Sequence, residues 1–174
     1  MNRTSTISKE HYTGADRLAY AVATGLGAGL VPFAPGTVGA VEGVAIYLAI
    51  GSLHLGQAFS LVAIAIINLV VFAAGVWASS RTCEITGLKD ARVIVIDEVS
   101  GQLIALTPLA LLSSLSIRGV IIGFILFRLF DIFKPYPIRK LEGLHGGFGV
   151  MADDALAGVY AGLLLWLSSL VGVA

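Results

Sequence analysis

The sequence predicts an all-α fold, a compact helical membrane bundle of about six helical segments, some of them short or re-entrant. Hydrophobic residues make up 57% of the 174 residues and charged residues only 13%. Soluble domains average about 25% charged residues, and a soluble chain this short needs a large polar surface. The second observation is the series of apolar runs separated by short polar connections, which is typical of membrane helices.

Six apolar segments are the predicted helices: Leu18–Val31, Val38–Ile50, Gln57–Ser80, Val99–Leu115, Gly119–Phe133 and Ala155–Val173. A bilayer crossing takes about 20 apolar residues, so only the third and the last segments are predicted to span fully. The others are short crossings, re-entrant pieces or helices packed inside the bundle. Residues 1–17 form a polar N-terminal segment without the pattern of a cleavable signal peptide, and residues 18–174 form a single domain.

Charge and cysteine content exclude several classes of protein. The formal net charge is zero and the pI is about 6.8, so the sequence offers no electrostatic basis for binding nucleic acid. The single cysteine, Cys83, excludes an intramolecular disulfide and a multi-cysteine zinc site.

Most charged residues gather in two connections, 81–98 and 128–154. If the chain changes sides from segment to segment, both connections and the turn at 32–37 lie on one face of the membrane. Most Lys and Arg residues lie on that face, and the positive-inside bias makes it cytoplasmic. The sequence therefore predicts a multi-pass protein whose polar motifs face the cytoplasm.

Two adjacent acids, Asp97 and Glu98, stand at the start of the fourth segment. The dipole and free N–H groups of a helix N-terminus stabilise acids, which is sufficient to explain one of them. A second charge at the membrane boundary is costly unless it is paired or binds a metal. The pair therefore indicates a functional site.

A second motif combines one acid with two cations on a single helix face. Arg128 and Asp131 are three residues apart, and Lys134 extends the same face just before Pro135 ends the helix. As a structural feature alone this is a buried ion pair. As a site it supplies one acid for a metal and two cations for a phosphate.

The third motif runs from His145 to Asp154. Its glycines, including Gly147 and Gly149, leave backbone N–H groups that a phosphate can approach closely. Either Asp153 or Asp154 is expected to cap the last helix, which leaves the other acid unexplained. His145 is either a general acid or base or a solvated loop residue.

The stretch 32–39 is a turn followed by a helix, as its Pro and Gly residues indicate. Thr37 is expected to cap that helix. The helix N-terminus, which includes Thr37 and Gly39, offers N–H groups to an anion on the same face as the acids.

Five acids are therefore expected to converge: Asp97, Glu98, Asp131, Asp153 and Asp154. Carboxylate oxygens without cysteine or several histidines favour Mg²⁺ or Mn²⁺ over zinc. A metal beside two cations and a glycine-rich segment indicates phosphoryl chemistry.

Four stretches, in this order, resemble the phosphatidylglycerophosphatase A family: Pro35-Gly36-Thr37-x-Gly39, Asp97-Glu98-x-x-Gly101, Phe127-Arg128-x-x-Asp131-x-x-Lys134-Pro135-x-Pro137-Ile138 and His145-Gly146-Gly147-x-Gly149-x-Met151-x-Asp153-Asp154-x-x-Ala157-Gly158. The resemblance runs along the chain from about residue 20 to residue 165. Ala40 is a small departure, because relatives often carry Ser after the glycine.

The resemblance implies a Mg²⁺-dependent lipid phosphatase of the bacterial inner membrane. Its expected reaction is hydrolysis of the terminal phosphomonoester of phosphatidylglycerophosphate to give phosphatidylglycerol. On this hypothesis the five acids are catalytic and hold Mg²⁺, and seven residues bind the substrate: Thr37, Gly39, Arg128, Lys134, His145, Gly147 and Gly149. Either water attacks directly or an aspartate first forms an aspartyl-phosphate.

Other classes of protein compete with a phosphatase. A CDP-alcohol phosphatidyltransferase also joins acids, Mg²⁺ and membrane helices, but the sequence lacks its Asp-x-x-Asp-Gly pattern and spaced second Asp pair. A transporter with a buried ion-pair network predicts acids near mid-membrane rather than at segment ends. A water-soluble bundle of the same ancestry is a further alternative. Cys83 lacks the Cys-x5-Arg loop of a cysteine phosphatase, because residue 89 is Lys.

Overall fold

A computed structural model describes residues 13–88, 91–112 and 116–172. These residues form helices and no strand, which confirms the predicted all-α class. In chain order the elements are α1 (Gly14–Ala23), η1 (Gly25–Leu30), α2 (Pro35–Ser52), α3 (Gln57–Thr86), α4 (Ile96–Leu111), α5 (Ile117–Phe133), α6 (Ile138–Leu141) and α7 (Gly146–Leu170).

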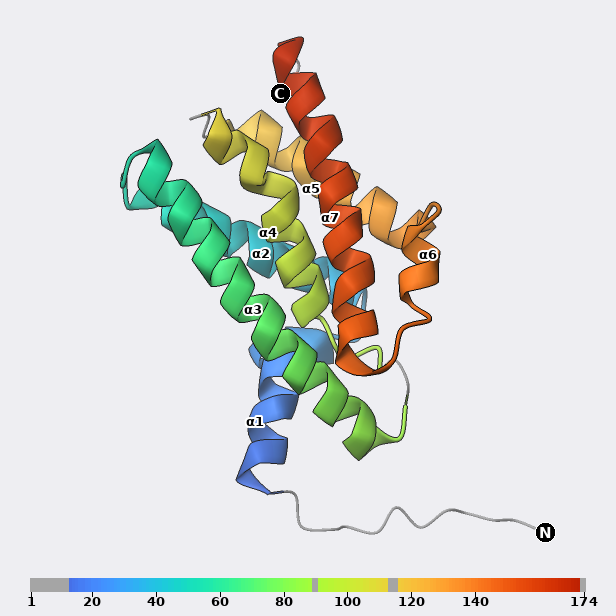
Figure 1. Cartoon of the computed structure of the whole chain (residues 1–174). Coiled ribbons are helices and arrows are strands. Elements are labelled where there is room, and N and C mark those ends of the chain that lie inside the picture. The colour runs from blue at the N-terminus through green and yellow to red at the C-terminus, as the bar shows by residue number, and fades with distance from the viewer. Residues whose placement is uncertain (1–12, 89–90, 113–115, 173–174) are drawn as a thin grey trace, which may run out of the picture.

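Helices α4 and α7 pack side by side at the centre of the bundle (Figure 1). Both also pack against α3 and α5, α2 packs on α4, and α1 packs on α3. Glycines allow the central pair to approach closely: a Cβ on Gly101 would lie 2.6 Å from the carbonyl oxygen of Asp154, and one on Gly158 would collide with the carbonyl of Gly101. Gly158 and Gly162 are four residues apart on α7, a spacing of small residues that allows helices in a membrane to approach closely.

Two helices, α3 and α7, are long and apolar enough to cross a membrane. The mean hydropathy is 2.6 over the most apolar 18-residue stretch of α3 and 1.5 over that of α7. They correspond to the two segments predicted to span fully. Only 11% of this stretch of α3 is buried inside the protein, so nearly all of its apolar surface faces outward. A water-soluble bundle would bury such a face, and the arrangement therefore indicates a membrane protein.

The first predicted segment, Leu18–Val31, is wrong as a single helix. Helix α1 already begins at Gly14 and ends at Ala23, and the 3₁₀ helix η1 follows it. Backbone φ is positive at Gly25, Leu26 and Gly27, a conformation that interrupts a right-handed helix. These three residues form the first half of η1, so α1 ends at Ala23 and η1 itself is kinked.

The last helix begins at Gly146 rather than at Ala155 as predicted. Its N-cap is His145, so Asp153 and Asp154 lie about two turns inside α7 and cap nothing. Glycine has a low helix propensity, but packing of this stretch on α3 and α6 outweighs it.

Helix α6 is a single short turn that the sequence did not predict. The predicted ends of the fourth and sixth segments, Leu115 and Val173, lie outside the described residues, as do residues 1–12 of the polar N-terminal segment.

Candidate active site

Parts of four helices meet at one end of the bundle. Helix α4 carries Asp97 and Glu98 in its first turn, as predicted, and α2 begins beside them at Pro35. Helix α5 ends at Phe133, and the first third of α7 completes the group. The structure therefore brings all four sequence motifs together.

Three carboxylates form a compact cluster. Asp97, Glu98 and Asp154 each offer an oxygen within 4.8 Å of the other two. One buried oxygen of each, Oδ1 of Asp97, Oε2 of Glu98 and Oδ2 of Asp154, has no hydrogen-bond partner among the described residues. Buried carboxylate oxygens without donors are costly, so this cluster is suited to a bound cation.

Arg128 joins the cluster to Asp131. Its Nη1 lies 2.6 Å from Oδ2 of Asp131, one turn along α5, and 3.7 Å from Oε1 of Glu98 on α4. The Nε of Arg128 is buried and has no hydrogen-bond partner in the described part of the chain. The guanidinium therefore has an unused donor beside the acids, which an anion can accept from.

Lys134 is the second cation of the site. Its Nζ lies 2.5 Å from Oδ2 of Asp153, 2.9 Å from Oε1 of Glu142 and 4.0 Å from Oδ1 of Asp131. Burial alone would lower the pKa of Lys134, but the hydrogen bond and charge of Asp153, together with the hydrogen bond to Glu142 and the charge of Asp154, hold that pKa above its usual range. The side chain is therefore a fixed positive charge at neutral pH.

The backbone of Lys134 adopts a conformation that is unusual for a residue other than glycine. It is the C-cap of α5 with φ 42°, in the left-handed region, and its N–H donates to the carbonyl of Phe130. For a residue other than glycine this conformation costs about 1 kcal/mol, and such strain is often found at functional sites.

A cavity of about 260 Å³ opens between the acids and Lys134. Its lining residues are Asp97, Lys134, Glu142, Leu144, Gly146, Gly149, Val150 and Asp153. A carboxylate of the cluster and a cation therefore face the same space, which is large enough for a phosphate group.

The N-terminus of α2 closes the other side of the cluster. A Cβ on Gly36 would collide with Oε1 of Glu98 and lie 3.2 Å from Nη1 of Arg128. Thr37 lies in the same first turn, half-buried, and its N–H donates to the carbonyl of Ala34. The N-cap of α2 is Ala34, so the prediction that Thr37 caps this helix is wrong. The positive end of the α2 dipole thus lies beside Glu98 and Arg128.

The remaining predicted substrate-binding residues differ in their surroundings. Gly39 packs on the chain before α4, where a Cβ would lie 2.7 Å from the carbonyl oxygen of Val95. Gly147 is buried against α3, and its N–H donates to Oγ of Ser80 at 2.7 Å. His145 is exposed and does not line the cavity, whereas Gly149 does.

Sequence reasoning did not single out two residues of this site. Glu142 contacts Lys134 only because α6 turns the chain back toward α5, and no spacing rule indicates that turn. Gly36 was part of a recognised turn, and only its contact with Glu98 shows why a side chain does not fit there.

A second cavity, of about 210 Å³, lies around the connection between α2 and α3. Tyr47, His54 and Gln57 are among its lining residues, and no carboxylate is. It therefore has no acidic cluster of the kind found in the first cavity.

Asp97, Asp153 and Lys134 line the first cavity, and the rest of the acidic cluster, the partly buried Arg128 and the N-terminus of α2 lie next to Asp97. Opposite charges arranged in this way can bind a phosphomonoester and stabilise the charge that develops when it is cleaved.

Comparisons with known proteins point to the same chemistry. Residues 21–169 match the profile of the family described as Phosphatidylglycerophosphatase A. Proteins named "Phosphatidylglycerophosphatase A" from Haemophilus influenzae and Escherichia coli are 39% and 35% identical over 146 and 148 residues. These alignments cover 83% and 84% of this chain and 85% and 81% of the two relatives.

A protein of Bacteroides thetaiotaomicron named "Putative phosphatidylinositol-3-phosphatase" is 41% identical over 144 residues, 83% of this chain and 89% of the relative. No solved structure matches the chain.

Proposed function

Because this chain belongs to the phosphatidylglycerophosphatase A family, we propose that it is a lipid phosphatase that converts phosphatidylglycerophosphate to phosphatidylglycerol. The observation that carries the proposal is the cluster of Asp97, Glu98 and Asp154 beside the cations Arg128 and Lys134. This set of charges suits a phosphomonoester and offers nothing to a neutral substrate.

The proposed cofactor is Mg²⁺, held by the carboxylates of Asp97, Glu98 and Asp154. Hard oxygen donors without sulfur ligands suit this ion, and the three buried oxygens without partners are the donors it needs. Bound Mg²⁺ would neutralise phosphate charge and activate a water molecule.

The residues of the chain have separate tasks in this proposal. Arg128 and Lys134 bind the phosphate oxygens and stabilise their charge during cleavage. Asp131 and Asp153, which contact these cations at 2.6 and 2.5 Å, orient them. The N-terminus of α2 adds a favourable dipole from the opposite side. The five predicted acids thus divide into a metal-binding group of three and an orienting group of two.

The proposed location is the bacterial inner membrane, with several crossings and the site facing the cytoplasm. Arg81, Lys134, Arg139 and Lys140 lie toward the end of the bundle that holds the site, whereas Arg118 begins α5 at the other end. The positive-inside bias favours a cytoplasmic position for the more basic end.

A second substrate has support from one relative, whose name refers to a phosphatidylinositol phosphate. Both lipids present a terminal phosphomonoester next to a phosphodiester. The charges of the site suit either lipid, so a competition assay with both lipids decides the headgroup preference.

The test is phosphate release by the full chain, purified in detergent, from phosphatidylglycerophosphate or phosphatidylinositol 3-phosphate, with Mg²⁺ or with EDTA. We expect Mg²⁺-dependent release with preference for phosphatidylglycerophosphate. Asp131→Asn should lower kcat by roughly 10²-fold or more, because Arg128 and Lys134 lose the carboxylate between them.

Glu84→Gln is the matched control, because Glu84 also forms an ion pair with an arginine three residues away, but its side chain is 65% exposed and does not line the cavity. Its activity should stay within about threefold of wild type, as expected for an exposed ion pair. No release from either lipid with any divalent metal would refute the proposed function. Faster release from the inositol lipid would refute the proposed substrate only.

A further inference from the structure

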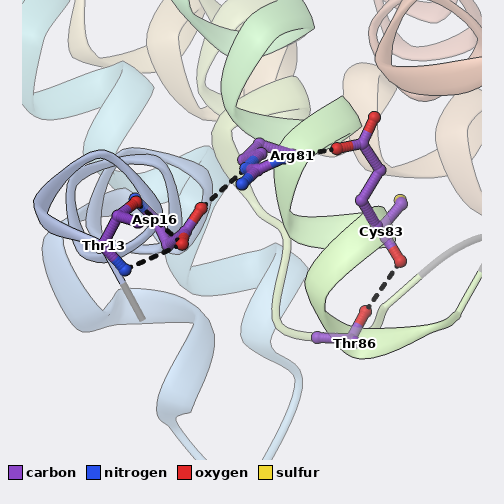
Figure 2. Close-up of polar contacts among 6 residues, drawn as sticks. Thr13, Asp16, Arg81, Cys83 and Thr86 are labelled. Atoms are coloured by element: carbon purple, nitrogen blue, oxygen red, sulfur yellow. Dashed lines mark hydrogen bonds and ion pairs between the residues drawn. The ribbon is translucent and has the colours of Figure 1, made fainter. Parts of the chain in front are cut away.

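A second ionic contact lies away from the acidic cluster and joins α1 to α3 (Figure 2). Oδ1 of Asp16 lies 2.6 Å from Nε of Arg81, although the two residues are 65 positions apart. Oδ2 of Asp16 accepts hydrogen bonds from the N–H and the hydroxyl of Thr13 at 2.9 and 2.8 Å. Both oxygens of a carboxylate that is only 6% exposed are therefore in use.

The fully buried contact between the two helices that this pair joins is made of small side chains. The buried residues of α1 besides Asp16 are Ala19 and Ala23, and the neighbouring stretch of α3 buries Ala78, Ser79 and Thr82. Small side chains make a smooth contact that tolerates rotation or sliding of one helix on the other. The ion pair supplies the specific contact.

The far end of α1 holds the chain that leads into the acidic cluster. The carbonyl of Ala23 accepts a hydrogen bond of 2.9 Å from the N–H of Val95. Outside the helices, this is the only backbone hydrogen bond between distant segments of the described chain. Val95 is fully buried and is the N-cap of α4, so Asp97 and Glu98 follow it by two and three residues.

The turn after α1 contacts the same stretch. A Cβ on Gly29 would collide with the carbonyl of Val93, and one on Gly25 would lie 3.1 Å from Cγ2 of Val95. The backbone of residues 93–95 is therefore held by α1 and η1 together. Asp16 and Ala23 are seven residues apart, about 10 Å along one short rigid helix.

We propose that the Asp16–Arg81 ion pair positions the acidic cluster: it fixes α1 on α3, α1 fixes Val95, and Val95 sets the start of α4 and with it Asp97 and Glu98. Asp16 and Arg81 are positioning residues and touch no substrate. The kinetic part of this proposal rests on the proposed phosphatase activity, whereas the backbone part does not.

The experiment uses the full chain in detergent and three variants of the pair. Arg81→Gln removes the charge from a side chain that is 44% exposed, Arg81→Lys keeps it, and Asp16→Asn keeps an acceptor for Thr13. Glu84→Gln is the control, because Glu84 contacts Arg81 within α3 and does not reach α1.

Two quantities are measured: hydrogen exchange of the peptide containing residues 91–96, and steady-state kinetics. We expect faster exchange in that peptide for Arg81→Gln and Asp16→Asn, with the rest of α4 and α7 unchanged. We expect kcat to fall roughly tenfold and KM to change less than about twofold, because the acids shift while Arg128 and Lys134 stay in place. Arg81→Lys should recover most of the loss, and Glu84→Gln should match wild type.

The proposal is overturned if Arg81→Gln leaves exchange at 91–96 unchanged. It is also overturned if exchange rises over the whole chain and activity falls only with the folded fraction, since that result means a purely structural role. If the wild type shows no phosphatase activity, the proposed function fails and the exchange measurement alone decides the positioning role.

Discussion

Replacing Gly36 with alanine adds one methyl group at the most crowded point of the site. The added Cβ would lie 2.9 Å from Cδ of Glu98, and ordinary contacts begin at about 3.4 Å. It would also lie 3.2 Å from Nη1 of Arg128 and collide with Oε1 of Glu98. Both side chains belong to the proposed site, so the methyl group must displace the carboxylate, the guanidinium or both.

We expect Gly36→Ala to lower kcat by roughly 10²-fold, the cost of a misplacement of about 1 Å in a catalytic group. Stability should change little, because alanine gains about 1 kcal/mol in helix propensity over glycine, which offsets the crowding. The assay is phosphate release from phosphatidylglycerophosphate in mixed micelles, with thermal unfolding measured on the same sample.

Gly162→Ala is the control for this variant. Its Cβ would meet its neighbours on α4 at 3.4–3.5 Å, an ordinary contact distance, and it is remote from the acids. Activity within about twofold of wild type is expected, because the neighbours of Gly162 accommodate the methyl group at ordinary contact distances. Wild-type turnover by folded Gly36→Ala would refute the reasoning, because Glu98 and Arg128 would then not need their present positions.

Three further predictions follow from described contacts. Lys134→Met leaves Asp153 without its cation, and phosphate release should fall by roughly 10²–10³-fold in the same assay. Gly147→Ala forces a methyl group into the backbone of α3 and should lower the free energy of unfolding by about 1–3 kcal/mol in a denaturant titration. The Arg81 guanidinium holds the pKa of Asp16 below its usual value, so the stabilisation is complete at neutral pH and lost as pH falls through that pKa. The difference between the Tm at pH 7 and the Tm at about pH 3 should therefore be smaller for Asp16→Asn than for wild type.

Each of these has its own control. Lys140→Met removes an exposed cation that contacts only Tyr136 in the described structure and should leave activity near wild type; an equal loss in both lysine variants would argue against a specific role for the first. Gly14→Ala adds a methyl group where nothing lies within 4 Å, and a matching destabilisation there would contradict the packing argument. An unchanged gap in Tm for the Asp16 variant would show that its ion pair adds no pH-dependent stability.

The fold was largely predictable because long apolar segments have few alternatives. The two helices that are long and apolar enough to span a membrane, and the start of α4 beside Asp97, follow from abrupt changes between polar and apolar residues. The break after α1 was not predictable, because positive φ at Leu26 is rare for leucine and depends on packing. The early start of α7 was missed because its glycines have low helix propensity, whereas their contacts with α3 are tertiary.

The residues of the candidate site could be named from the sequence, but the contacts between them could not. Alternation of segments across the membrane was enough to expect the acids on one face. It did not indicate that Asp153 pairs with Lys134 while Asp154 joins Asp97, because adjacent residues on a helix point in different directions. The pairing of Asp16 with Arg81 was equally out of reach, since it joins helices far apart in the sequence.

The hydrogen bond between Gly147 and Ser80 holds the start of α7 beside the end of the apolar stretch of α3. Ser80 marks the end of the apolar stretch of α3, and Asp154 lies seven residues further into α7, about 10 Å along the helix axis. In the proposed membrane location, Asp154 therefore lies on the bilayer side of the point at which α3 leaves the apolar layer. The proposed phospholipid substrate would then reach the site by lateral diffusion within its leaflet. The turnover of an enzyme that meets its substrate in this way depends on the mole fraction of substrate in the membrane or micelle surface. Diluting that surface with inert lipid or detergent should slow turnover even when the bulk substrate concentration is held constant.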